Sequence, residues 1–239
     1  TLAGAQELVD AARVRGVWGM VAFMKRFAPA NVVAKEYLES GECGRLSSIT
    51  AIHGSGPYDD VRRMMFFNGI HLLDLARFFA GDVRSVYACA WDALPTAKAV
   101  AACMEFASGV VGHLNMNSGG TWTDCFEQVY LSAEATQVVV ENSHSVEVIS
   151  PRSRFAEAAG WSTFGWSRRY YVSHNQSGWA AGAHYTRGYW GEMSHFARAV
   201  LGQVQPTPTL EDGLEDIRLI DAILLSAQVR EPVEVASVS

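Results

Sequence analysis

Apolar and polar residues recur with two different periods along this chain, and the changes of period predict its elements. Residues 2–15 place apolar side chains at helical spacing, between a capping Thr1 and a terminating Gly16. The almost wholly apolar run 17–24 that follows is typical of a strand buried on both faces. A helix, a glycine turn and such a strand together are typical of the end of a βαβ unit, which predicts that the chain begins inside a domain.

Helical spacing returns further along the chain. It predicts helices at about residues 30–40, 69–80, 187–201 and 210–228. In the third of these, the residues expected to face inward are Tyr189, Met193, Phe196 and Val200. The fourth opens on Thr209 and Asp212, which have the spacing of a capping box. Residues 55–66, with glycine, proline and a cluster of charges, are expected to form a loop.

Alternation of apolar and polar residues predicts strands at 45–54, repeatedly from 83 to 149, and at 232–235. Residues 110–117 carry apolar side chains on one face and polar ones on the other, as in an antiparallel meander with one covered face. Helices before and after the strands should cover the apolar face. The pattern therefore predicts an α+β fold, an open and mainly antiparallel sheet with helices on one face.

Composition excludes several classes of function. The chain has 25 acidic and 19 basic residues and a net charge of −6, which argues against nucleic-acid binding. No apolar run is long enough to predict a membrane span. Four cysteines without a Cys-x-x-Cys pair indicate a reducing, cytoplasmic location, and no histidine has the spacing of a metal-ligand pair.

One group of polar residues has the spacing of a candidate catalytic site. Asn68, His71 and Asp74 are three residues apart and share one face of a predicted helix. Asp74 would fix the ring of His71, and His71 would exchange a proton with a substrate hydroxyl near neutral pH. In the alternative interpretation Asn68 caps the helix and His71 is a hydrogen-bonded core residue. The spacing leaves both open.

Four stretches, in one order, resemble the Gfo/Idh/MocA oxidoreductase family, which includes glucose–fructose oxidoreductase and inositol dehydrogenase. One is GIHLLDLARFFAGDVRSVYA at residues 69–88, similar to a helix and strand of that family. The others are residues 21–51, 105–117 and 188–235, which resemble its domain crossover, a strand pair and its last helices. Together they cover essentially the whole chain, although no single motif is diagnostic.

The resemblance implies an oxidoreductase that uses NAD or NADP and acts on a sugar, a polyol or a similar hydroxyl or carbonyl compound. Residues 1–24 would be the last helix and strand of a dinucleotide-binding domain, and 25–239 the substrate-binding and oligomerisation domain. The glycine-rich fingerprint and a Glu-Lys-Pro lysine would precede Thr1, so the cofactor would be bound mainly outside this chain. This chain alone would then be inactive.

The resemblance also assigns roles to residues. His71 matches the family histidine that moves the proton, and Asp74 matches an aspartate with a structural or supporting role. The family has Asp four residues before that histidine, where this chain has Phe67. Either His71 acts without the carboxylate, with Asn68 orienting the substrate, or the dehydrogenase step is altered or lost.

The remaining candidates line the expected crevice between the two domains. Lys25 and Arg26 follow the apolar run where the domains would meet, although a surface or capping role for Arg26 is equally open. Tyr58 and Tyr185 are further candidates for contact with a sugar. The aromatic stretch 155–190 suits either a subunit interface or sugar stacking.

The mixed sheet face, with His113, Asn115 and Asn117, is expected to pack against a second subunit in a homodimer or homotetramer. Two other functions stay open. One is a non-catalytic sugar-binding or assembly module that has lost the nucleotide domain. The other is a relative that cleaves glycosides with the help of bound NAD.

Overall fold

The computed structural model describes residues 1–95, 97–119, 126–150, 166–171 and 179–238. The strands are β1 Leu46–Gly54, β2 Val83–Leu94, β3 Ala97–Phe106, β4 Val111–Asn117, β5 Phe126–Ala133, β6 Gln137–Glu141, β7 Ser145–Ser150, β8 Trp166–Tyr171 and β9 Val233–Glu234. The helices are α1 Leu2–Arg15, α2 Pro29–Glu39, α3 Val61–Met64, α4 Ile70–Ala80, α6 Trp179–Thr186, α7 Tyr189–Val200 and α8 Leu210–Val229. Shorter turns are the 3-10 helices η1 Met24–Phe27 and η3 Val235–Ser237 and the π-helix η2 Met65–Gly69.

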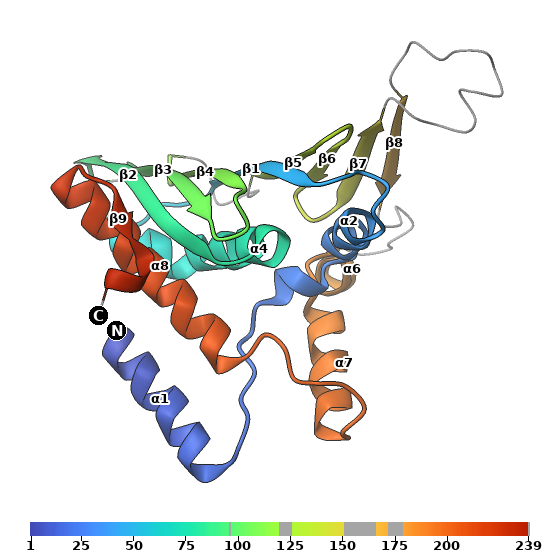
Figure 1. Ribbon diagram of the computed structural model, residues 1–239, viewed down its shortest axis with the longest axis horizontal. Coiled ribbons are helices and arrows are strands. Elements are labelled where there is room, and N and C mark those ends of the chain that lie inside the picture. The colour runs from blue at the N-terminus through green and yellow to red at the C-terminus, as the bar shows by residue number, and fades with distance from the viewer. Residues whose placement is uncertain (96, 120–125, 151–165, 172–178, 239) are drawn as a thin grey trace.

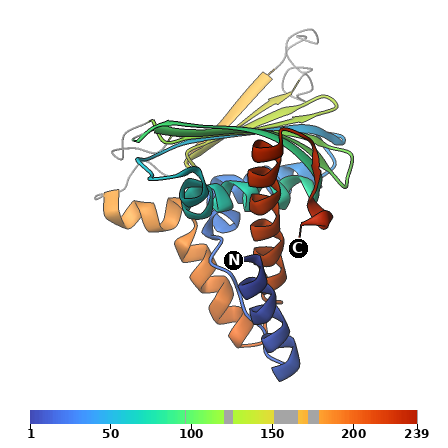
Figure 2. The ribbon, with the colours of Figure 1, turned by 90° about the vertical axis from the view of Figure 1, so that its left-hand side faces the viewer.

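The described strands form one nine-stranded sheet in the order β8-β7-β6-β5-β1-β4-β3-β2-β9. Neighbouring strands are antiparallel except β1 and β4, which are parallel. All the described helices lie on one side of the sheet, and the described residues leave its other face open (Figures 1 and 2). The α+β fold predicted from the sequence, with an open and mainly antiparallel sheet, is confirmed.

The core lies between the sheet and helices α4 and α8. Alternate residues of the strands face it, such as Ile49 on β1 and Leu114 and Met116 on β4, and each is almost wholly buried. Leu72 of α4 and Ile220 of α8 meet them from the helix side. Each such side chain contributes roughly 1.5–3 kcal/mol by leaving water. The polar residues of β4 alternate onto the open face, as the pattern predicts.

The strand order corrects one expectation. A single meander would place β5 beside β4, but β1 lies between them. Two meanders, β2–β3–β4 and β5–β6–β7–β8, therefore lie on either side of β1. Strands β1 and β4 are parallel, so the chain must cross over between them, and helix α4 with its preceding turns is part of that crossover. Alternation predicts the strands and their faces, but not which strands are neighbours.

Residues 17–23 form no sheet strand, contrary to the sequence prediction. Their backbone makes one isolated bridge, from Met20 to Thr209, and Val17 and Trp18 are exposed. A strand buried on both faces needs hydrogen-bonded neighbours on both edges, and here only the segment at 208–209 runs beside it. Helix α1 before it packs along α8, as Figures 1 and 2 show.

The predicted loop at 55–66 is also corrected. Residues 61–80 form a continuous helical stretch in which the π-helix η2 joins α3 to α4. The Asp60 carboxylate caps its start by accepting a hydrogen bond from the Arg63 amide at 2.7 Å. The charged residues that suggested a loop are the exposed side of α3. The wider π turn lies immediately before His71, and such turns are frequent at functional sites.

Helix α7 faces the opposite way to the one expected. The apolar residues predicted to face inward are exposed, with Met193 61% and Val200 60% accessible. Its glycine face packs on η1 instead, where a Cβ on Gly188 would lie 2.0 Å from the Met24 carbonyl oxygen. Close backbone contact at Gly188 and Gly191 therefore fixes which side of the helix is covered. By contrast, the capping box of α8 at Thr209 and Asp212 is confirmed.

Candidate functional site

Polar side chains replace apolar ones on the covered face of the sheet where β1 ends. His53 of β1 lies directly opposite Glu127 of β5 in the strand register. Both are in phase with core residues, Ala51 on β1 and Val129 on β5, and each is only 4% exposed. An acid and an imidazole are therefore buried side by side next to the hydrophobic core.

These two residues organise a hydrogen-bond chain. Glu127 Oε2 accepts from the Lys25 ammonium and lies 3.1 Å from His53 Nδ1. His53 Nε2 lies 3.0 Å from the Ser55 hydroxyl. Because Glu127 accepts, Nδ1 carries the proton and Nε2 accepts from Ser55. The tautomer of His53 is thereby fixed.

The π-helix closes the chain of contacts. The Asn68 side-chain amide donates to Ser55 Oγ at 2.5 Å and also to the Tyr58 hydroxyl. Tyr58 is buried, and its ring lies 6.2 Å from that of Phe67, which is 60% exposed. We call Lys25, His53, Ser55, Asn68, His71 and Glu127 the histidine cluster.

His71 is the member of the cluster with a buried nitrogen that makes no hydrogen bond to the described residues. It lies in the first turn of α4, that nitrogen is Nδ1, and the Phe23 ring meets the imidazole edge-on at 6.0 Å. Burial, assisted by the charge of Lys25, lowers the pKa of His71 to about 4. Burial and the same lysine lower the pKa of His53 to about 3. Both rings are neutral at neutral pH, and His71 keeps hydrogen-bonding capacity for a ligand.

Asp74 does not hold His71, contrary to the sequence prediction. Its carboxylate accepts from Arg26 instead, with Nε at 3.0 and 3.1 Å from its two oxygens and Nη2 at 2.5 Å from Oδ1. Arg26 Nη2 also donates to Asp212 at 3.2 Å. Asp74 is fully buried, so its partner must satisfy its charge. The structure thus gives Arg26 and Asp74 structural partners.

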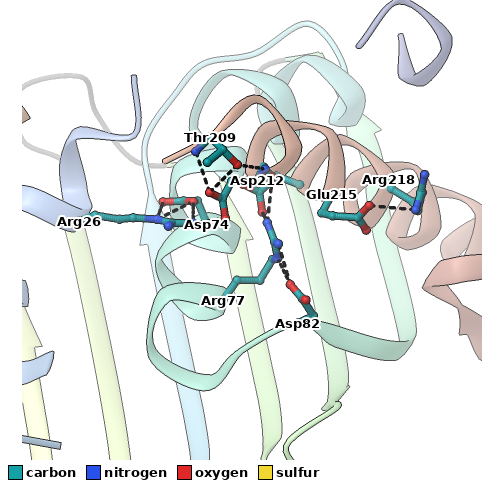
Figure 3. A network of polar contacts seen from close by, with 9 residues as sticks. Arg26, Asp74, Arg77, Asp82, Thr209, Asp212, Glu215 and Arg218 are labelled. Carbon is teal, nitrogen blue, oxygen red and sulfur yellow. Dashed lines mark hydrogen bonds and ion pairs between the residues drawn. The ribbon is translucent and has the colours of Figure 1, made fainter. Parts of the chain in front are cut away.

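A second arginine extends these contacts (Figure 3). Arg77 donates to Asp216 at 2.9 Å and to the Asp212 backbone carbonyl at 2.9 Å, and it also pairs with Asp82. The Asp212 side chain meanwhile belongs to the capping box at the start of α8. Helix α4 is therefore tied to the start of α8. We call Arg26, Asp74, Arg77, Asp82, Asp212 and Asp216 the arginine network.

The structure brings most of the predicted site residues together. Lys25, Asn68, Tyr58 and His71 meet at the end of β1, whereas Arg26 and Asp74 belong to the arginine network. Tyr185 lies on α6, half-exposed, and the contacts of the described residues do not join it to the cluster. Parts of the aromatic stretch, at 151–165 and 172–178, lie outside the described residues.

Sequence reasoning missed Ser55 and Glu127. Glu127 carried a usable signal, because its place in the alternation of β5 puts a carboxylate in phase with Val129 and Leu131. Ser55 had none, since a serine after a strand is ordinary. Within the described residues, no group of three or more potential ligands could hold a metal ion, and no helix has the length and apolar character to cross a membrane.

Comparison with known proteins bears on the origin of this site. Residues 32–130, which include β1, α4 and β4, match the family model described as the GFO/IDH/MocA C-terminal domain. The matched part of the chain is similar to a Gfo/Idh/MocA C-terminal domain. A search of curated protein sequences finds no match.

Solved structures share the fold of this chain over nearly its whole length. A levoglucosan dehydrogenase in complex with NADH is 20% identical with a TM-score of 0.81, over 98% of this chain and 70% of that one. A dehydrogenase from Chromobacterium violaceum is 23% identical with a TM-score of 0.81, over 96% and 67%. An oxidoreductase from Agrobacterium radiobacter, in complex with NAD+, L-tartaric acid and magnesium, is 17% identical with a TM-score of 0.80, over 99% and 70%. The family and these neighbours are oxidoreductases.

Proposed function

We propose that this chain is the substrate-binding part of an NAD(P)-dependent oxidoreductase that acts on a sugar, a polyol or a similar hydroxyl or carbonyl compound. The observation that carries the proposal is His71, a neutral imidazole with a buried, unpartnered nitrogen beside a polar cluster. Neighbouring structures hold NADH with levoglucosan or with L-sorbose. A dinucleotide-binding domain would complete the site.

The residues of the cluster divide the work of binding and proton transfer. His71 accepts the proton of the substrate hydroxyl during oxidation and returns it during reduction. Lys25 and Asn68 contact substrate oxygens, and Tyr58 holds the Asn68 amide in place. Phe67, exposed at the rim, offers an apolar surface to the substrate where the resembling family has a carboxylate.

The cofactor is a nicotinamide dinucleotide, which when bound accepts or supplies the hydride. The open hydrogen-bonding capacity of His71 fits a reacting hydroxyl or carbonyl beside it. The sequence holds no glycine-rich fingerprint opening a helix, so we assign its phosphate groups to no residue here. The choice between NAD and NADP would rest with the dinucleotide-binding domain.

Formation of reduced nicotinamide by the full-length protein tests the proposal. Sugars and polyols, including levoglucosan and L-sorbose, are offered with NAD+ or NADP+, or with the reduced cofactor for carbonyl substrates. We expect His71→Asn to lower kcat/KM by about 10²–10⁴-fold, the usual contribution of a general acid–base. His195→Asn is the matched control, because that ring contacts the Gln205 carbonyl at 3.0 Å and the Phe27 ring at 5.2 Å and not the residues of the cluster.

Two results would overturn the proposal. Absence of NAD(H) and NADP(H) binding in calorimetry would favour the non-catalytic sugar-binding or assembly module. Hydrolysis of nitrophenyl glycosides that requires added NAD, without net reduction, would favour the glycoside-cleaving alternative.

We further propose that the open sheet face joins two copies of the chain in a homodimer or homotetramer. Tyr87 is 41%, Trp91 46% and Val111 55% exposed there, beside uncharged residues such as Ala101 and Asn115. An exposed apolar patch of this kind is typical of an interface. Light scattering after gel filtration should show a dimer or tetramer, and Ala101→Arg should dissociate it. A wild-type monomer at micromolar concentration would refute this interface.

The location of the protein follows from its thiols. Cys43, Cys89 and Cys103 are free in the described structure. We infer a reducing compartment such as the cytoplasm, where exposed thiols persist.

A further inference from the structure

Burying the Glu127 carboxylate costs desolvation free energy, which points to a functional role for this residue. Its side chain is 5% exposed and lies in register with core residues of β5. A buried ion pair adds little net stability, because desolvation of two charges offsets their attraction. Three groups nevertheless converge on this carboxylate: the Lys25 ammonium and His53 on Oε2, and the Ser143 hydroxyl on Oε1 at 3.3 Å.

The turn between β6 and β7 also serves this carboxylate. Asn142 and Ser143 both have left-handed backbones, with φ of 50° and 54°. Such conformations cost roughly 1–2 kcal/mol for residues other than glycine. In return the Asn142 side chain accepts from the Glu127 amide at 2.7 Å, and Ser143 reaches the carboxylate. Strain of this kind is typical of positions that the surroundings fix for a purpose.

The result is a fixed ammonium beside His71. Charged groups packed against α4 come from η1, β1 and α8. Arg26 is paired with Asp74 and Asp212, Arg77 is paired with Asp216 and Asp82, and His53 is neutral. The charge of Lys25, although paired with Glu127, acts on both His53 and His71.

We propose that the Lys25 ammonium, held in the histidine cluster by Glu127 as its positioning residue, keeps His71 unprotonated and stabilises negative charge on the substrate oxygen. This deepens the proposed function and rests on it for the role of the substrate. A carboxylate beside His71 would do the reverse and favour the imidazolium. With Phe67 at the position where the resembling family has Asp, this site relies on a cation instead.

The proton affinity of His71 tests the clamp without any turnover. The full-length protein is labelled with ¹³C at histidine Cε1, His71→Asn identifies the resonance, and its titration is followed by NMR. Lys25→Met should raise the His71 midpoint by roughly one unit, a tenfold change in proton affinity. Lys25→Arg, which keeps the charge, should leave the midpoint within a few tenths of a unit of wild type. Lys35→Met is the matched control, because that lysine pairs with Glu39 at 3.3 Å on α2.

Glu127→Gln separates positioning from simple charge. If Glu127 acted on His71 only through its negative charge, losing that charge would lower the pH midpoint of the His71 titration. If Glu127 holds Lys25 in place, releasing the lysine should raise the midpoint. The proposal therefore requires a higher midpoint in Glu127→Gln. Should that variant not fold, Ser143→Ala weakens the same clamp and should raise the midpoint by less. An unchanged midpoint in Lys25→Met, or a fall in Glu127→Gln, would overturn the proposal.

The outcome is distinct from that of the activity assay. If the midpoint moves as expected in a protein that turns over no sugar or polyol, the electrostatic clamp holds and the proposed reaction fails. If turnover is found but the midpoint does not move, the reaction holds and the clamp fails. In an active protein, the acid limb of the kcat/KM profile should move to higher pH in Lys25→Met together with the NMR midpoint.

Discussion

Lys25 and Arg26 are neighbours in η1, yet they enter two polar networks of opposite character. In the arginine network Arg26 spreads its donors over Asp74 and Asp212 and ties helices α4 and α8 together. In the histidine cluster Lys25 meets a buried carboxylate beside His71, whose Nδ1 has no partner. The arginine network ties two helices together and leaves one carboxylate oxygen, Asp216 Oδ2, without a partner among the described residues, whereas the histidine cluster leaves an imidazole nitrogen that can accept or donate a proton.

The difference follows from the two cationic groups. A guanidinium is planar and its parallel donors match both oxygens of a carboxylate, which suits the fully buried Asp74. An ammonium is a compact charge without the fixed, planar donor geometry of a guanidinium. Lys25 can therefore pair with Glu127 while its charge lowers the pKa of both His53 and His71. Adjacent basic residues in a sequence can thus have unrelated roles.

The two networks should differ most in the free energy of unfolding that is lost when each one is disrupted. Asp74→Ala leaves Arg26 without its main partner in the interior, which should lower the free energy of unfolding by about 3–5 kcal/mol. Urea unfolding measures it, with the exposed pair of Asp59 and Arg63 as control, where Asp59→Ala should cost about 0–1 kcal/mol. Lys25→Met combined with Glu127→Gln removes the pair of the histidine cluster without leaving a buried charge and should cost less. If that double variant is as destabilising as Asp74→Ala, both networks are structural and the contrast fails.

The two networks should contribute to the pH dependence of stability with opposite signs. Folding lowers the pKa of His53 to about 3 and of His71 to about 4, below the value of about 6.5 in an unfolded chain. Between those values each of these histidines binds more protons in the unfolded chain, so its contribution to the free energy of unfolding falls as the pH is lowered from about 6.5 toward 4. Burial raises the pKa of Asp74 to about 6 and that of Asp216 well above its usual range, so those two carboxyl groups act in the opposite direction. The loss is about 1.4 kcal/mol per pH unit for each histidine.

Urea unfolding at several pH values tests this slope. His53→Gln should reduce it by about one proton's contribution. An equal slope in His53→Gln and wild type would mean that His53 is not kept neutral by the fold.

The sequence predicts local features of this molecule well and distant pairings poorly. The two faces of β4 follow from alternation, and the start of α8 follows from the Thr209 and Asp212 spacing. Asn68 and His71 were predicted as site residues because they are three apart on one helix. The sequence could not predict that Asp74 pairs with Arg26, which is 48 residues away, because helical spacing says nothing about other elements.

Two other failures have the same physical basis. Periodicity shows that Met193 and Val200 share one face of α7, but the close fit of Gly188 and Gly191 on η1 decides which face is covered. Glu127 stands out in the alternation of β5, but its partner Lys25 is 102 residues away. Tertiary contacts, not local pattern, select the partner of a buried charge.

The smallest expected effect lies at Ser143, where strain and hydrogen bonding oppose one another. Ser143→Gly removes the hydroxyl from Glu127 but relieves the left-handed backbone, so the two changes should nearly cancel, within about 0.5 kcal/mol in urea unfolding. Ser143→Ala loses the hydroxyl and keeps the strain, and should destabilise by about 1 kcal/mol. The gap between the two variants measures the strain itself. If glycine destabilises as much as alanine, the turn is not strained, and the hydroxyl holds Glu127 as a purely structural partner, as in the arginine network.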